Sequence, residues 1–368
     1  MTGKGNGSFS LKDEFGKYER LGEPDKAEKS IIWQTAIGLQ QTDGLRTSDY
    51  LIELAKQNIE GEITIGEVKK RLDIYYRSRP ALPEDEPRMK EADEVSSRIS
   101  EILAEKAFNF SPAELITIHK RLFRGIYKFA GRIRDYNITK TEWVLDGKTV
   151  YYAGADSIRA TLDYDFEQEK KFNYKGLTKR QTTEQIAKFA SGVWQIHPFG
   201  EGNTRTTAVF IIKYLHTLGF PVTNDLFADN SWYFRNALVR ANYSDHSSNI
   251  HPTYEYLNRF FGNLLLGESD PLRNRDLHVR AGGADNDTKN KAQNKAHIKR
   301  SDPEIKLTAA EAAVLEYLKR HPNATQIETA DAVGRSRRTV QVTISSLKEK
   351  GLIERSGSKK TGEWTVKD

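Results

Sequence analysis

The chain has 368 residues, of which 37% are hydrophobic and 29% charged, and its formal net charge is +6. It contains no cysteine, which excludes disulfides and thiolate metal sites. No apolar run is long enough to span a bilayer, and the polar residues 1–8 lack the apolar core of a signal peptide. We therefore expect two or three domains, a cytoplasmic location and no membrane segment.

Polar residues 1–28 are predicted to form a flexible arm, and residues 29–80 a helical segment. Within this segment, Ser48 precedes apolar residues at helical spacing and is typical of an N-cap. The sequence 61–64 breaks that helix and a second one follows, so the segment contains a helical hairpin. Prolines at 80 and 83 end it.

Residues 81–267 are predicted to form the main domain, which is mostly helical. Ser111 and Pro112 begin one helix, since Ser favours the N-cap and Pro the first helical position. The run from Ile138 to Tyr152 contains two segments rich in β-formers around Asp146-Gly147, which predicts a β-hairpin. Helical patterns resume and continue to Leu266.

Residues 268–302 are poor in apolar side chains and are predicted to form a flexible linker. Residues 303–368 then read as helix, helix, turn, helix and hairpin, an α+β order that resembles a winged helix-turn-helix. We expect this unit to bind duplex DNA through basic and polar side chains of the third helix and of the wing. Protein docking is the alternative. The residues expected to contact DNA are Arg335, Arg337, Arg338, Thr339, Gln341, Arg355, Lys359 and Lys360.

Nine consecutive residues, 197–205, gather a base, a carboxylate, a Gly/Asn turn and an arginine before an apolar run that predicts a buried helix. The turn and the helix N-terminus form an anion site, and Arg205 can bind phosphate oxygens with its planar fork. Glu201 is a hard oxygen ligand suited to Mg²⁺, and His197 titrates near neutrality. An ordinary turn beside a solvated glutamate is the alternative interpretation.

This motif resembles the signature of the Fic family, His-x-Phe-x-(Asp/Glu)-Gly-Asn-x-Arg-x-x-Arg, whose members transfer AMP from ATP to protein hydroxyls. The resemblance covers residues 31–266. Thr204 stands where Gly is common, and Ala208 stands where many members have a second arginine. The family implies that His197 is the catalytic base and that Glu201 holds Mg²⁺. It assigns nucleotide binding to Gly200, Gly202, Asn203, Thr204 and Arg205.

Further roles follow from the same resemblance. The hairpin at Ile138–Tyr152 corresponds to a flap that holds the target protein by strand addition. Tyr233, Arg235 and Asn236 correspond to a segment beside the nucleotide base, although core packing and surface exposure would explain them equally well. A homodimer is compatible with the family.

The N-terminal helices resemble an inhibitory segment in which a glutamate pairs with the second arginine of the motif. Asp43 and Glu60 both match this acid in part. Since Ala208 replaces that arginine, we expect the acid to lack its ion-pair partner, unless Arg235 has taken over.

The sequence thus predicts a protein adenylyltransferase that uses ATP and Mg²⁺ on a target protein or on itself, joined to a DNA-binding unit. The alternatives are a Fic enzyme with another donor, one that removes AMP, and a DNA-binding regulator whose Fic domain senses nucleotide.

Overall fold

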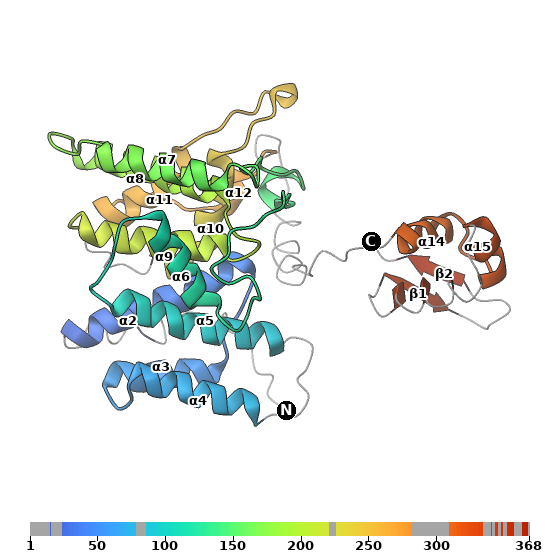
Figure 1. The fold of residues 1–368 in the computed structure, drawn as a ribbon, viewed down its shortest axis with the longest axis horizontal. Helices are drawn as coiled ribbons and strands as arrows, with labels where there is room; N and C mark the ends of the chain where they lie inside the picture. Colours follow the sequence, from blue (N-terminus) through green and yellow to red (C-terminus); the bar gives the residue numbers. More distant parts are fainter. Residues whose placement is uncertain are drawn as a thin grey trace, which may run out of the picture. The chain divides into compact units, whose positions relative to one another are not determined.

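A computed structural model of the chain describes residue 15 and residues 24–78, 86–220, 226–280, 309–333, 340, 343–344, 347–348, 352–356 and 363–366. The chain forms two compact units, Met1–Asn290 and Lys291–Asp368 (Figure 1). The finer boundaries expected at residues 28, 80, 267 and 302 stay predictions.

The first unit is mainly helical in its described part. Its long helices are α2 (Pro24–Gly38), α3 (Asp49–Glu60), α4 (Ile65–Arg77), α5 (Glu86–Ala104), α6 (Pro112–Phe123), α7 (Ile158–Lys171), α8 (Lys179–Ile196), α9 (Asn203–Thr217), α10 (Leu226–Ala241) and α11 (Glu255–Leu266). Short turns are η1 (Leu39–Asp43), η2 (Trp143–Leu145), η3 (His246–Ser248) and α12 (Asn274–Leu277).

The helix starts follow local chemistry. Ser48 and Ser111 are the N-caps of α3 and α6, and each side chain accepts a hydrogen bond from a backbone N–H three residues later, as expected. Gly61 ends α3 with a φ of 82°, a backbone conformation that glycine adopts without strain. The predicted hairpin of helices is therefore confirmed as α3 and α4.

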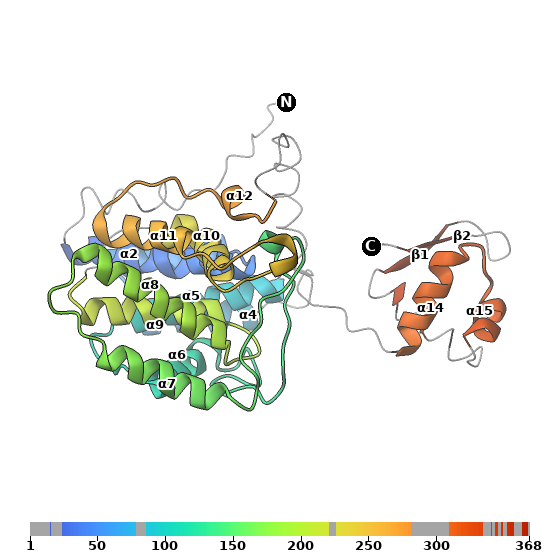
Figure 2. The same cartoon turned by 90° about the horizontal axis from the view of Figure 1, so that it is seen from above.

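Helix α9 lies in the middle of the first unit (Figure 2). It packs against α5, α6, α8 and η1, and every residue from Asn203 to Leu215 is buried. Burial on all sides explains the continuous apolar run from Ala208 to Ile212, which follows the polar first turns of the helix. The start of α9, where the motif ends, is thereby held by η1 and α5, which precede it in the chain, and by α6 and α8.

Helices α3 and α4 build a second, smaller core against α2, which includes Trp33 and Leu54 (Figure 1). Phe15 is buried in this core, and α2 begins at Pro24. The predicted flexible arm therefore differs from the structure at Phe15 and at residues 24–28. The other residues of the arm lie outside the described part.

The predicted β-hairpin at Ile138–Tyr152 is present as a chain reversal without paired strands. The chain reverses at Asp146 and Gly147, which both have positive φ, and the Glu142 N–H donates to the Lys148 carbonyl at 2.9 Å. Val144 and Leu145 are both fully buried, and neighbouring side chains on a strand would point to opposite faces. The tight turn η2 buries both.

The predicted linker also differs from the structure over residues 268–280. Leu277 is buried in the main core, and its carbonyl accepts a hydrogen bond from Arg240 at 2.6 Å. The Val279 N–H donates to the Val144 carbonyl at 3.0 Å. This stretch therefore packs on the helical unit, and residues 281–302 lie outside the described part.

The second unit contains α14 (Ala309–Arg320), α15 (Gln326–Ala332), β1 (Ile353–Ser356) and β2 (Glu363–Val366). The strands are antiparallel, with Ile353 opposite Val366, which confirms the predicted hairpin. Described residues of the third predicted helix are helical, and Val340, Ile344 and Leu347 face the core at helical spacing. Trp364 joins that core.

Among the described residues, no helix combines the length and the apolar character needed to cross a membrane.

Candidate active site

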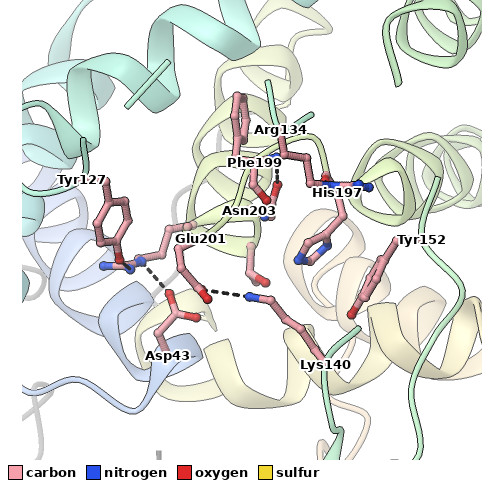
Figure 3. Close-up of polar contacts among 12 residues, drawn as sticks. Asp43, Tyr127, Arg134, Lys140, Tyr152, His197, Phe199, Glu201 and Asn203 are labelled. Carbon is pink, nitrogen blue, oxygen red and sulfur yellow. Dashed lines mark hydrogen bonds and ion pairs between the residues drawn. The ribbon is translucent and has the colours of Figure 1, made fainter. Parts of the chain in front are cut away.

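His197 ends α8 and turns the chain toward the motif loop. It has a φ of 50°, an uncommon conformation for a residue other than glycine. Arg134 supports this turn, because its Nε donates to the His197 carbonyl at 2.8 Å and its backbone N–H to the Pro198 carbonyl at 2.9 Å. The His197 ring packs on that of Tyr152, with centroids 4.2 Å apart (Figure 3).

The hydrogen bonds of His197 define its reactive nitrogen. Nδ1 lies 3.1 Å from the Trp194 carbonyl, and because a carbonyl can only accept, Nδ1 carries the proton. Nε2 keeps its lone pair, and it is buried without a hydrogen-bond partner in the described part of the chain. Burial, and then the charges of Lys140, Arg235 and Arg134, hold the pKa of His197 well below 6.5. The ring is therefore a neutral base.

The motif loop is closed by Asn203, whose side chain donates to the Phe199 carbonyl at 2.8 Å and accepts from the Phe199 N–H at 3.0 Å. Gly202 has a φ of 77°, and a Cβ there would lie 2.4 Å from the ring of Phe123. Thr204 accepts a hydrogen bond from Trp194 Nε1 at 3.0 Å. The N–H groups of the first turn of α9 have no partner within the helix, so this end favours an anion.

Arg205 is 1% exposed and lies among acids. Its Nε is 2.6 Å from Asp43 Oδ2, and one terminal nitrogen is 2.8 Å from Glu91 Oε1. Gln40 and Tyr127 add hydrogen bonds. Burial tends to lower the pKa of Arg205, but Asp43, Tyr127 and Glu91 outweigh it and the pKa is raised. Arg205 is a permanent cation, already bound by two carboxylates.

This arrangement corrects the expectation that the inhibitory acid lacks a partner. Ala208 is buried and supplies no cation, but Asp43 pairs with Arg205 instead. Arg235 pairs with the fully buried Glu142, at 2.6 Å, and has not taken over that role. Glu60 lies at the end of α3 and pairs with Lys26. Of the two candidate acids, Asp43 is the one at the motif.

Glu201 is exposed and pairs with Lys140, whose Nζ lies 2.9 Å from the carboxylate (Figure 3). Among the described residues, no group of three or more His, Cys, Asp or Glu side chains is placed to hold a metal ion. A cation at Glu201 would therefore take its remaining ligands from phosphates and water. Mg²⁺ binds in this way, through one or two carboxylates and substrate phosphates.

Tyr233 and Asn236 are buried, and the contacts described for them are with α11 and α12. Asn236 Nδ2 donates to Asn274 at the start of α12, and the charges nearest Tyr233 belong to α11 and α12. Their role as nucleotide ligands stays a prediction. Arg235, by contrast, lies beside Glu142 and close enough to His197 to lower its pKa.

His119 was not anticipated from the sequence. Its ring stacks on Phe199 with centroids 3.7 Å apart, Nδ1 accepts from the Gly131 N–H at 2.8 Å, and Nε2 donates to the Glu201 carbonyl at 3.0 Å. Burial lowers its pKa to about 4, so the ring stays neutral. A histidine at a buried position among the apolar residues of α6 is the sequence signal that could have found it.

Comparison with known families gives a match within each of the two units. Residues 109–215 match the Fic/DOC family, and residues 305–362 match the MarR family. A region that matches the Fic/DOC family is thus followed in the chain by a region that matches the MarR family.

Two curated relatives are similar to part of the chain. The protein adenylyltransferase VbhT of Bartonella schoenbuchensis is 27% identical over 108 residues, which are 29% of this chain and 21% of that protein. A protein adenylyltransferase of Bartonella henselae is 30% identical over 110 residues, 27% of this chain and 20% of that protein. The chain thus spans about a fifth of the length of these relatives.

Solved structures of Fic proteins are also similar. A Fic family protein from Desulfovibrio desulfuricans G20 is 14% identical, with a TM-score of 0.42 and coverage of 97% of this chain and 93% of that chain. The BepC protein of Bartonella tribocorum, with bound AMPPNP, is 22% identical, with a TM-score of 0.39 and coverage of 50% and 87%.

Proposed function

We propose that this protein transfers AMP from ATP to a Ser, Thr or Tyr hydroxyl of a target protein or of itself. The observation that carries the proposal is the buried, neutral His197 with its Nε2 lone pair unused, at the entrance of a loop suited to phosphate. The Fic match over 109–215 and the names of the two partial relatives support the same reaction.

The chemistry follows from the positions of the residues. His197 Nε2 accepts the proton of the target hydroxyl while its oxygen attacks the α-phosphorus. The bond between the α-phosphorus and the bridging oxygen of the β-phosphate breaks, and pyrophosphate leaves with that oxygen. The N-terminus of α9 and the loop at Gly202 neutralise phosphate charge, which is the main contribution to catalysis in phosphoryl transfer.

Glu201 is the proposed ligand of Mg²⁺, which when bound would neutralise charge on the phosphates. The rest of the loop contributes orientation. Asn203 fixes the loop on Phe199, and Arg134 fixes the backbone of His197. Segment 138–152 lies beside His197 through Tyr152 and is the proposed support for the target protein.

The test is transfer of labelled AMP to protein in Mg²⁺, with mass spectrometry to locate it. We expect transfer by the wild type and a loss of roughly 10²–10⁴-fold in His197→Ala, with nucleotide affinity largely retained, since the base acts on the hydroxyl. His251→Ala is the matched control, because His251 is exposed and bonds to Asn249. Near-normal transfer by His197→Ala would contradict the mechanism.

The same assay separates the alternatives. Labelled product from another nucleoside triphosphate would identify a different donor, and release of AMP from modified protein would identify the reverse activity. Nucleotide that binds but is never transferred would support the nucleotide-sensing regulator. The engagement of Arg205 by Asp43 and Glu91 is the observation that favours this second candidate.

We also propose that the second unit binds duplex DNA. The MarR match over 305–362 supports this, together with the basic residues of the third helix and of the wing, which lie outside the described residues or have side chains that are not described. Gel shifts of the full chain with duplex DNA should show binding, through residues 303–368, that weakens as salt rises. Neutralising Arg337 or Lys359 should each reduce the salt slope by about one. Absence of binding at low salt would favour protein docking.

A further inference from the structure

Lys140 lies over the motif loop. Its backbone N–H donates to Thr149 Oγ1 at 3.2 Å, and its Nζ reaches Glu201 at 2.9 Å. The Lys140 side chain is 25% exposed, whereas that of Glu201 is 53% exposed. Lys140 stands between Glu201 and the His197–Tyr152 pair (Figure 3), and of the neighbouring charges it lowers the pKa of His197 most, after burial. Its ammonium is thus close to both the carboxylate and the base.

The other cations near the loop are committed elsewhere within the described structure. Arg205 binds Asp43 and Glu91, and Arg235 binds Glu142, which is fully buried. The guanidinium of Arg134 donates to carbonyls of the backbone at His197, Tyr136 and Ala153. Position 208, where the family signature has its second arginine, is a buried alanine. A triphosphate at this loop therefore needs its cation from another element.

Lys140 differs from these arginines in what holds it. Its partner, Glu201, is the proposed metal ligand. A divalent cation and an ammonium compete for one carboxylate, so metal binding releases the lysine at the place where phosphates would lie. Lysine has a flexible four-carbon stem and three rotatable donors, which lets the ammonium change partners without movement of the backbone.

We propose that Lys140 binds the phosphates of the nucleotide donor, after exchanging Glu201 for a phosphate oxygen when the metal arrives. The exchange keeps each carboxylate and each ammonium paired in both states. Segment 138–152 thereby takes part in nucleotide recognition as well as in the proposed support of the target. This inference rests on the proposed function for the identity of the donor.

The alternative is that Lys140 and Glu201 form an ordinary surface ion pair. Such pairs contribute little, because solvent screens them and both side chains lose freedom. In that case removing the ammonium leaves nucleotide affinity unchanged.

The first experiment measures the Kd of a non-hydrolysable ATP analogue, with Mg²⁺, by calorimetry. Lys140→Met keeps most of the apolar stem and should raise this Kd at least about tenfold, as expected for loss of a hydrogen bond between charged groups. The Kd for adenosine should stay within about twofold, since adenosine has no phosphate. Lys148→Met is the matched control, because Lys148 lies on the same segment and pairs with Asp245. Equal analogue affinity in Lys140→Met and the wild type overturns the proposal.

The second experiment tests the exchange itself in metal-free buffer. Glu201→Gln should bind the analogue more tightly than the wild type, because it frees the ammonium of Lys140. That gain must disappear when Lys140→Met is added to Glu201→Gln. A gain that persists in the double variant would come from lost repulsion between Glu201 and phosphate, and it would refute the exchange.

Failure of this inference and failure of the proposed function give different results. Both experiments measure binding and need no transfer. A wild type that binds the analogue through Lys140 but never transfers AMP supports the inference and contradicts the proposed function. A wild type that transfers AMP but binds equally well without Lys140 does the opposite.

Discussion

Replacing Asp43 tests whether the ion pair with Arg205 restrains the site. In the structure this pair spans 2.6 Å, and the guanidinium is 1% exposed. A phosphate that needs Arg205 must therefore displace Asp43. We expect Asp43→Ala to tighten binding of the Mg²⁺–ATP analogue and to speed transfer to the protein itself.

The magnitude follows from the number of acids on Arg205. A close ion pair contributes about 1.5–7 kcal/mol, which corresponds to roughly tenfold in affinity at the lower end. Glu91 still holds one terminal nitrogen of Arg205 at 2.8 Å after Asp43 is gone. The gain should therefore fall near the lower end, about tenfold. This exceeds the few-fold effect expected if the acid had no arginine partner.

The assay combines calorimetry with the rate of AMP incorporation. Glu60→Ala is the control, since Glu60 pairs with Lys26 and lies on α3, away from the motif. Thermal unfolding of both variants shows that the fold is kept. Unchanged affinity and unchanged rate in Asp43→Ala would refute the restraint, and a similar gain in Glu60→Ala would show that loosening of the N-terminal helices is the cause.

Two further predictions concern pH. Burial and the charges of Lys140, Arg235 and Arg134 lower the pKa of His197, so the transfer rate should stay level as pH falls through 6.5 and decline only below it; a decline centred at 6.5 would contradict this. Buried Asp93 accepts hydrogen bonds from Ser48 and Tyr76, and burial raises its pKa to about 6. Because the folded pKa lies above the ordinary value of 3.8 for an aspartate, the stabilisation is present below that value and is lost as pH rises through about 6. Tyr76→Phe removes a donor that favours the charged carboxylate, so it should lower unfolding free energy by about 1–3 kcal/mol at pH 8 and by less at pH 5; an equal loss at both would refute the link.

Local signals predicted much of the fold. The caps at Ser48 and Ser111 and the glycine at 61 act within one turn of helix, so sequence alone locates them. The motif from His197 to Arg205 was found for the same reason, because its parts are consecutive. The buried helix α9 follows from its unbroken apolar run.

Contacts between distant segments were not predictable in this way. Glu91 and Lys140 are ordinary charged residues in their local sequence, and each becomes part of the site only when α5 and the segment 138–152 pack beside α9. The hairpin was misread because Val144 and Leu145 are strand formers that are instead buried together in a turn. Residues 268–280 were misread because a few apolar side chains, such as Leu277, suffice to dock a polar stretch.

The acids around Arg205 set a limit on how the protein can be divided. The Fic match spans 109–215, yet Gln40, Asp43 and Glu91, which neutralise and bond this guanidinium, all precede it. Arg235, on α10, comes after the end of the match. A fragment cut at the match would lose η1 and α5, so it would expose the faces of α9 that pack on them and remove both counter-ions of Arg205. The unit that folds around this site is therefore larger than the region by which it is recognised, and expression of the isolated match should yield unstable protein.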